Sequence, residues 1–201
     1  ADLAPTYVHA EKPDALCALL RSEQSCVDAA ASPSSSHPMV DWINADCEIP
    51  DELYDTVPDL QLYPTSAVAV VPIYNLPNHT ATDPPLVLAA DVLADIFLTA
   101  LTRWDDPRIV ATNPALVARG KLPVGPIQVI VRSSISGVTE MFRRSLAKFD
   151  NGSFAAEVGI SASASWGNAS VLTCASTYGG TSPCVLRTPL SIGYALLTDV
   201  L

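Results

Sequence analysis

A short turn of small residues, Arg132-Ser-Ser-Ile-Ser136-Gly137, contains the residue types that bind a small anion. A serine- and glycine-rich turn that leads into a helix leaves several backbone N–H groups without an intrahelical acceptor, and the helix macrodipole attracts negative charge to the same place. The guanidinium of Arg132 adds a bidentate donor for phosphate, sulfate or a carboxylate. The turn therefore predicts an anion cradle, although a simple helix cap uses the same residues.

A strand and a helix are expected to position this turn. Ile127, Val129 and Val131 alternate along the chain after a proline, which predicts a mostly buried strand. From Val138 to Phe149 the apolar residues recur at helical spacing instead. The side chains that we expect in the core are those of Phe97, Trp104, Phe142 and Phe149, with Tyr194 as a packing residue. Those expected on the solvated surface are Arg143 and Arg144.

Other segments alternate between strand and helix patterns. Residues 66–74 form a nearly continuous apolar strand, and Pro72 favours an edge or crossover position for it. Residues 91–104 give the clearest helix, Asp105-Asp-Pro closes it, and residues 189–197 form a final strand. Strands that alternate with helices indicate an α/β architecture.

Composition excludes several functions. The 201 residues are 49% hydrophobic and 16% charged, which suits a compact domain or two small lobes. A net charge of −10 without a basic stripe argues against a nucleic-acid partner. The longest apolar run, around residues 67–73, is too short to span a membrane. The sequence contains no zinc-ligand spacing, no Gly-x-Ser-x-Gly nucleophile elbow, no His-Glu-x-x-His motif, no P-loop and no dinucleotide-binding motif. We therefore expect that the protein binds no metal or cofactor and is not an enzyme.

The five cysteines indicate an oxidising compartment. Cys174 and Cys184 flank a turn-rich loop that a disulfide could close. Cys26 and Cys47 are further disulfide candidates. Together with Cys17 they make three remaining cysteines, so one of them is left free or joined to another segment or chain.

Three Asn-x-Ser/Thr sequons support the same compartment. They place candidate glycosylation sites at Asn78, Asn151 and Asn168. Together with the cysteines, they predict a secreted or cell-surface eukaryotic protein.

Several phrases of the chain, taken together, resemble the PstS-type phosphate-binding proteins, which have the type II periplasmic-binding-protein fold. The matching phrases are 27–32 (VDAAAS), 62–64 (LYP), 70–76 (VVPIYNL), 92–97 (VLADIF), 102–107 (TRWDDP), 132–139 (RSSISGVT) and 191–194 (SIGY). They follow the family order over most of residues 25–195.

The resemblance implies two α/β lobes joined by crossover strands, with the ligand held between them. Residues 1–67 would then be a partial first lobe, 68–75 a crossover strand, 76–190 the second lobe, and 191–201 the return crossover. The first lobe would be incomplete, because the usual opening strand and helix and the C-terminal return have no match. We therefore expect a domain cut from a larger protein or a shortened version of the fold.

The resemblance also assigns the anion-binding residues. Arg132, Ser136 and Gly137 match the family motif, whereas Val138 stands where a threonine is expected and offers only its N–H. Ser134 replaces an aspartate that orients the arginine. In the first lobe, Ser32 would face the ligand.

The first-lobe motif departs further from the family pattern. The residue after Ser32 is Pro33 and not the family aspartate that accepts the proton of hydrogen phosphate, a loss that sulfate would tolerate.

Two functions follow from these observations. The first is an extracellular solute-binding domain for phosphate or a related oxyanion. The second is a degenerate, non-binding module with a structural or adhesive role in a larger extracellular glycoprotein or assembly, where other segments or chains would be its partners.

Overall fold

The structure, a computed structural model, describes residues 51–56, 61–150, 152–167, 169–175 and 180–200. The chain divides into two compact units, Ala1–Thr65 and Ser66–Leu201. Helix α3 (Asp51–Thr56) belongs to the first unit and begins with two acidic residues, which suit the positive end of a helix. The predictions that lie outside the described residues are those on Cys17, Cys26, Ser32, Cys47, Asn151 and Asn168.

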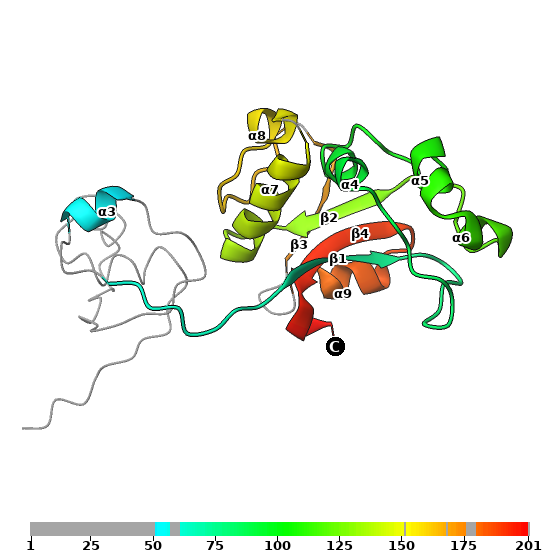
Figure 1. The fold of residues 1–201 in the computed structure, drawn as a ribbon, viewed down its shortest axis with the longest axis horizontal. Coiled ribbons are helices and arrows are strands. Elements are labelled where there is room, and N and C mark those ends of the chain that lie inside the picture. The colour runs from blue at the N-terminus through cyan, green and yellow to red at the C-terminus, as the bar shows by residue number, and fades with distance from the viewer. Residues whose placement is uncertain (1–50, 57–60, 151, 168, 176–179, 201) are drawn as a thin grey trace, which may run out of the picture. The chain divides into compact units, whose positions relative to one another are not determined.

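The second unit is built on a four-stranded sheet with the order β1-β4-β2-β3 (Figure 1). Its strands are β1 (Val70–Asn75), β2 (Gln128–Arg132), β3 (Leu172–Cys174) and β4 (Ser191–Leu196). β1 pairs antiparallel with β4, whereas β2 pairs parallel with both β3 and β4. Pro72 therefore lies on an edge strand, as predicted, where its missing N–H costs no ladder bond.

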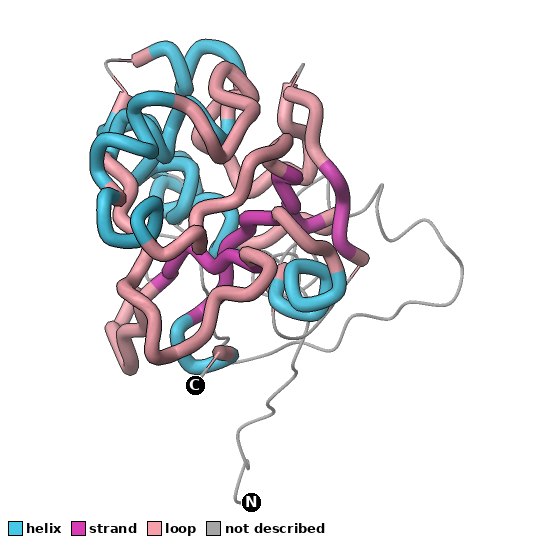
Figure 2. The backbone as a smooth tube through the Cα atoms, turned by 90° about the vertical axis from the view of Figure 1, so that its right-hand side faces the viewer, coloured by secondary structure: helices cyan, strands magenta, loops and turns pink. Residues whose placement is uncertain are grey.

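Helices cover both faces of this sheet (Figure 1). Helices α4 (Ala90–Phe97), α7 (Gly137–Phe149) and α8 (Ser153–Glu157) lie on one face, and α9 (Ser182–Arg187) lies on the other. Figure 2 shows the strands between α9 and the larger group of helices. The remaining elements of the described part are α5 (Pro107–Thr112), α6 (Pro114–Ala118) and the 3-10 helix η1 (Leu197–Asp199).

The core between the sheet and α7 is aromatic. Phe97, Trp104 and Phe142 are buried, as predicted. The ring of Phe97 meets that of Phe142 edge-on, with 4.8 Å between the ring centres, and Phe142 stacks on Tyr194 at 4.6 Å. Phe149 was expected in the core, but 44% of it is exposed because it is the last residue of α7.

Helix α4 is shorter than the predicted helix over residues 91–104. It ends at Phe97, and Thr99 adopts a left-handed conformation with a φ of 58°, which an α-helix cannot accommodate. Trp104 nevertheless stays buried, and its indole N–H donates to the carbonyl of Leu190 at 3.0 Å. The prediction that Trp104 lies in the core is confirmed, whereas the prediction that it lies in a helix is wrong.

A disulfide joins Cys174 at the end of β3 to Cys184 in α9, as predicted from their spacing of 10 residues. We expect the double variant Cys174→Ala/Cys184→Ala to lose about 2–3 kcal/mol of unfolding free energy, because the short loop gains entropy in the unfolded chain. Urea unfolding followed by fluorescence measures this loss. An unchanged unfolding free energy in the double variant would show that the disulfide does not stabilise the fold.

Candidate anion-binding site

The predicted strand, turn and helix are present. β2 ends at Arg132, and α7 begins at Gly137 after the extended residue Ser136. Backbone hydrogen bonds fix the turn at two points: Ser133 N–H donates to the carbonyl of Cys174, and Ser136 N–H donates to that of Ala162, both at 3.1 Å. The turn is therefore held by a neighbouring strand and by a separate loop.

The first turn of α7 presents backbone donors that no described residue accepts. Glu140 N–H donates to the Ser136 carbonyl at 3.1 Å. In the described part of the chain, the amides of Gly137, Val138 and Thr139 meet no such acceptor, although all three residues are buried. The Ser136 hydroxyl makes no capping bond either. Buried helix ends are normally satisfied by a side chain, water or a ligand.

The guanidinium of Arg132 adds to this set of donors. Its Nε is buried and has no acceptor among the described residues. Arg132, Ser136, Gly137 and Val138 thus combine one cationic side chain with the bare amides of a helix N-terminus. We call this arrangement, Arg132 and residues 136–139, the cradle. Its chemistry suits a small anion that accepts several hydrogen bonds at once.

Tyr194 of β4 connects the two elements that carry the cradle. Its hydroxyl lies 2.7 Å from Thr139 Oγ1 in α7 and accepts the N–H of Arg132 at the end of β2, at 3.4 Å. Burial raises the pKa of this hydroxyl, so it is a neutral phenol at physiological pH. The ring packs in the core, as predicted, whereas the hydrogen bonds of the hydroxyl were not predicted. A tyrosine in an otherwise apolar buried strand was the available signal.

We expect Tyr194→Phe to lower the unfolding free energy by about 1 kcal/mol and to weaken anion binding, because the turn loses its attachment to β4. Urea unfolding and calorimetric titration measure the two effects. The matched control is Tyr74→Phe, which removes a hydroxyl that accepts the Leu86 N–H in another part of the unit, at 3.3 Å. Equal anion affinities for the two variants would contradict the role of Tyr194 in the cradle.

Two arginines of α7 were both expected at the surface, and one was placed wrongly. Arg144 is partly exposed and donates to the Glu140 carboxylate at 3.2 Å, one helical turn away. Arg143 is completely buried. The carboxylate of Glu140, in the first turn beside the bare amides, is a further residue that the sequence analysis did not single out.

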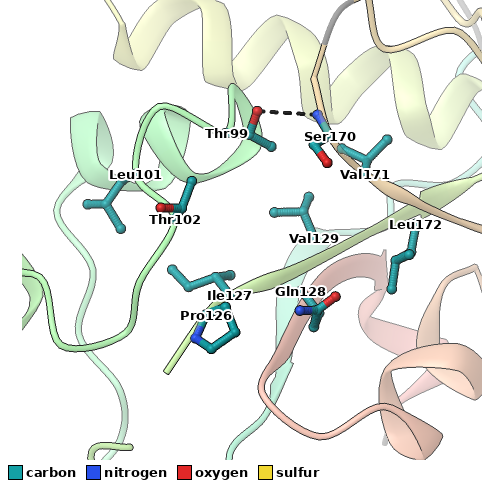
Figure 3. A pocket seen from close by; sticks show the side chains of 10 residues that line it. All are labelled: Thr99, Leu101, Thr102, Pro126, Ile127, Gln128, Val129, Ser170, Val171 and Leu172. Carbon is teal, nitrogen blue, oxygen red and sulfur yellow. Dashed lines mark hydrogen bonds between the residues drawn. The ribbon is translucent and has the colours of Figure 1, made fainter. Parts of the chain in front are cut away.

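A shallow cavity of about 250 Å³ lies at the opposite end of β2 (Figure 3). Neutral side chains line it, among them Thr99, Gln128 and Ser170, and the Ser170 N–H donates to Thr99 Oγ1 at 3.3 Å. Arg132 stands four residues beyond Gln128, which corresponds to roughly 13 Å along a strand. With no charged group in its lining, this cavity is not the predicted anion site.

Other predicted features stand as follows. Asn78 is exposed in a turn, and its glycosylation stays a prediction. Within the described ranges no three histidine, cysteine or acidic side chains cluster as metal ligands would. A search of the same residues finds no helix with the length and apolar character to cross a membrane.

Comparison with known proteins identifies the family. Residues 51–200 match the family model described as a PBP superfamily domain. The phosphate-binding protein PstS of Methanocaldococcus jannaschii is 35% identical over 138 residues, which are 68% of this chain and 34% of that protein. A protein of Acanthamoeba polyphaga mimivirus named "Putative serine/threonine-protein kinase/receptor R818" is 34% identical over 100 residues, 50% of this chain and 6% of that protein.

Solved structures show the same fold. A periplasmic phosphate-binding protein (PfluDING) bound with phosphate superposes with a TM-score of 0.56 at 20% identity, over 90% of this chain and 47% of the other. The phosphate-binding protein of Stenotrophomonas maltophilia gives a TM-score of 0.57 at 16% identity, over 91% and 51% of the two chains. This chain thus spans about half of these structures and about a third of the PstS relative. It belongs to the PBP superfamily domain family, and PstS phosphate-binding proteins are among its sequence relatives.

Proposed function

We propose that this domain binds a small tetrahedral oxyanion, phosphate or sulfate, in the cradle formed by Arg132 and residues 136–139. The observation that carries the proposal is that two kinds of donor, the first amides of α7 and the buried Nε of Arg132, have no acceptor among the residues that the structure describes. Buried donors of this kind are costly unless something accepts their hydrogen bonds. A tetrahedral oxyanion has enough acceptor atoms to do so.

The overall charge does not argue against an anionic ligand. The chain carries a net charge of −10, but charges beyond roughly 10 Å are screened at ordinary salt concentrations. Local donors in a desolvated site act at contact distance and are screened much less. The guanidinium and the helix N-terminus therefore decide which charge binds there.

Ser134 and Pro33 bear on which oxyanion binds. Ser134 stands in the turn where the resemblance places an aspartate, and Pro33 follows Ser32 where an acceptor for the proton of hydrogen phosphate is expected. A site that lacks these two carboxylates favours an anion that is fully ionised. On this basis sulfate is a ligand of equal standing with phosphate.

The comparisons support a binding role. The PstS relatives are named phosphate-binding proteins, and one solved structure of the same fold is described as bound with phosphate. This chain is accordingly a binding-protein domain and not an enzyme. We also propose that it is secreted or lies at the cell surface, which the disulfide between Cys174 and Cys184 supports.

The lobe organisation is part of the proposal. β1 and β4 would act as the outward and return crossovers, within residues 68–75 and 191–201, and residues 76–190 would form the second lobe. The antiparallel pairing of β1 with β4 supports this assignment, because it brings the two connections side by side. Residues 1–67 would be the partial first lobe.

Calorimetric titration of the chain with phosphate, sulfate and chloride tests the proposed function. We expect saturable heat with at least one tetrahedral oxyanion and much weaker binding of chloride, which offers a single acceptor atom. If neither oxyanion produces heat nor raises the unfolding temperature at millimolar concentration, the binding function is wrong.

A second candidate is a non-binding module with a structural or adhesive role in a larger extracellular protein. The observation that favours it is the mimivirus relative, in which the matching segment is 6% of the protein. A module embedded in so long a chain can serve as a spacer or contact surface. A folded chain that binds no oxyanion but associates with other segments of its parent protein would support this candidate over the first.

A further inference from the structure

Arg143 is buried in the middle of α7, and no carboxylate of the described residues pairs with it. Its side chain is fully inaccessible to solvent. One of its terminal nitrogens donates to the carbonyl of Ser161 at 3.0 Å, and the other donates to the carbonyl of Ser165. The guanidinium carbon lies 4.4 Å from the centre of the Trp166 ring. Within the described part of the chain, no acidic side chain pairs with it and its Nε has no acceptor.

A buried guanidinium is expensive, so its retention calls for a reason. Burial lowers the pKa of Arg143, although an arginine stays protonated at any physiological pH. Replacing a buried charge by an apolar side chain of similar size is often neutral or stabilising. An arginine is therefore not required simply to fill this part of the core.

The contacts of Arg143 lead back to the cradle. Ser161 and Ser165 flank Ala162, and the carbonyl of Ala162 accepts the N–H of Ser136 at the start of α7. Arg143 thus binds the loop of residues 161–166 through carbonyls on both sides of Ala162. The carbonyl of Ala162 in turn accepts the N–H of Ser136, the N-cap of the same helix. A local shift of this loop would release Ser136 and, with it, the bare amides that follow.

We infer that Arg143 is a positioning residue of the anion cradle, which fixes the loop of residues 161–166 against the first turn of α7 and adds a buried positive charge on the helix that carries the cradle. This inference rests on the proposed function. Its first part is geometric, through the carbonyls of Ser161 and Ser165 and the ring of Trp166. Its second part is electrostatic, because a buried charge is poorly screened and attracts an anion in the neighbouring site.

Tyr194 lies between the two guanidiniums and the first turn of α7. Burial raises the pKa of the Tyr194 hydroxyl, and the hydrogen bond to Thr139 and the charges of Arg143 and Arg132 offset part of this rise. That hydroxyl bonds to Thr139, whose N–H is one of the bare amides. Arg143 lies 4.4 Å from the centre of the Trp166 ring, and that ring lies 6.0 Å from the ring of Tyr194, so packed side chains connect the guanidinium to the base of the cradle.

The test compares Arg143→Met and Arg143→Lys with Arg187→Met, a control in α9 on the opposite face of the sheet. Sulfate and phosphate titrations at several ionic strengths give the affinities, and amide hydrogen exchange gives the protection of the Ser136 N–H. We expect the Met variant to lose about tenfold or more in affinity and to exchange the Ser136 amide faster. The Lys variant, which keeps the charge but not the planar fork, should recover part of the affinity.

Wild-type affinity together with wild-type Ser136 exchange in the Met variant would overturn the inference. If that variant does not fold, the Lys variant decides: its Ser136 exchange must exceed that of the Arg187→Met control. A wild-type chain that takes neither oxyanion would sink the proposed function separately. Faster Ser136 exchange in the Met variant would in that case still support the contact between Arg143 and the helix cap.

Discussion

Replacing Arg132 with methionine should weaken oxyanion binding at least about thirtyfold, since removal of one partner from a buried, hydrogen-bonded charge pair costs roughly 2–5 kcal/mol. The reason lies in the position of the side chain: its Nε is buried with no acceptor in the described part of the chain, at the end of the strand that precedes the bare amides. Without the guanidinium, the bound anion would keep only the amide and hydroxyl donors.

Calorimetric titration with phosphate and sulfate at one ionic strength measures this effect. The matched control is Arg103→Met, because Arg103 is an exposed arginine paired with Asp105 at 3.0 Å and lies outside the cradle. The control should bind as the wild type does. Equal affinities for the Arg132 variant and the wild type would remove Arg132 from the site.

The largest loss of stability is expected for Phe97→Ala, at about 3–5 kcal/mol of unfolding free energy. Phe97 is completely buried, and its ring contacts the rings of Phe142, Trp166 and Tyr194 with centre distances of 4.8, 5.9 and 6.3 Å. Truncation leaves a cavity between α4, α7 and the sheet. Such a loss is a large fraction of the stability of an ordinary domain.

Urea unfolding measures the unfolding free energies of Phe97→Ala and Phe149→Ala. The comparison shows whether the loss comes from the burial of the ring or from removal of any phenylalanine. Phe149 also belongs to an apolar helical pattern, but 44% of it is exposed at the end of α7. Its variant should lose about 1 kcal/mol or less. Similar losses for both variants would mean that Phe97 is not the centre of the aromatic core.

The strand, turn and helix around the cradle could be predicted from the sequence because their signals are local. The apolar period changes from alternating to helical within residues 127–149, and the small residues fall at the change. The disulfide was predictable for the same reason, since only 10 residues separate Cys174 from Cys184. Pro72 pointed to an edge strand because its missing N–H has a fixed structural consequence.

Arg143 could not be placed from the sequence because its partners are distant backbone atoms. The carbonyls of Ser161 and Ser165 and the ring of Trp166 lie 18 to 23 residues further along the chain. Backbone carbonyl acceptors leave no pattern in the sequence, and an arginine on a helix is normally solvated. The left-handed Thr99 that ends α4 was equally hidden, because a β-branched residue rarely adopts this conformation.

Asp106 and Pro107 mark the start of a helix, although the end of one was predicted there from the sequence. The sequence pattern predicts that Asp105-Asp-Pro ends a helix, but Asp106 caps the start of α5: its carboxylate accepts the Arg108 N–H at 2.9 Å, and Pro107 occupies the first helical position. An acid followed by proline is typical of a helix start. Asp106 and Pro107, considered together, predict a helix that starts at Pro107, which is α5.

The most direct test of the central claim is a sulfate and phosphate titration of the ¹⁵N-labelled chain followed by amide NMR. We predict that the amide signals of Gly137, Val138 and Thr139 shift progressively with one common dissociation constant, and that the Arg132 Nε–H signal shifts with them. Saturation of other amides while these signals stay unchanged would place the ligand elsewhere. It would contradict an anion site at the start of α7.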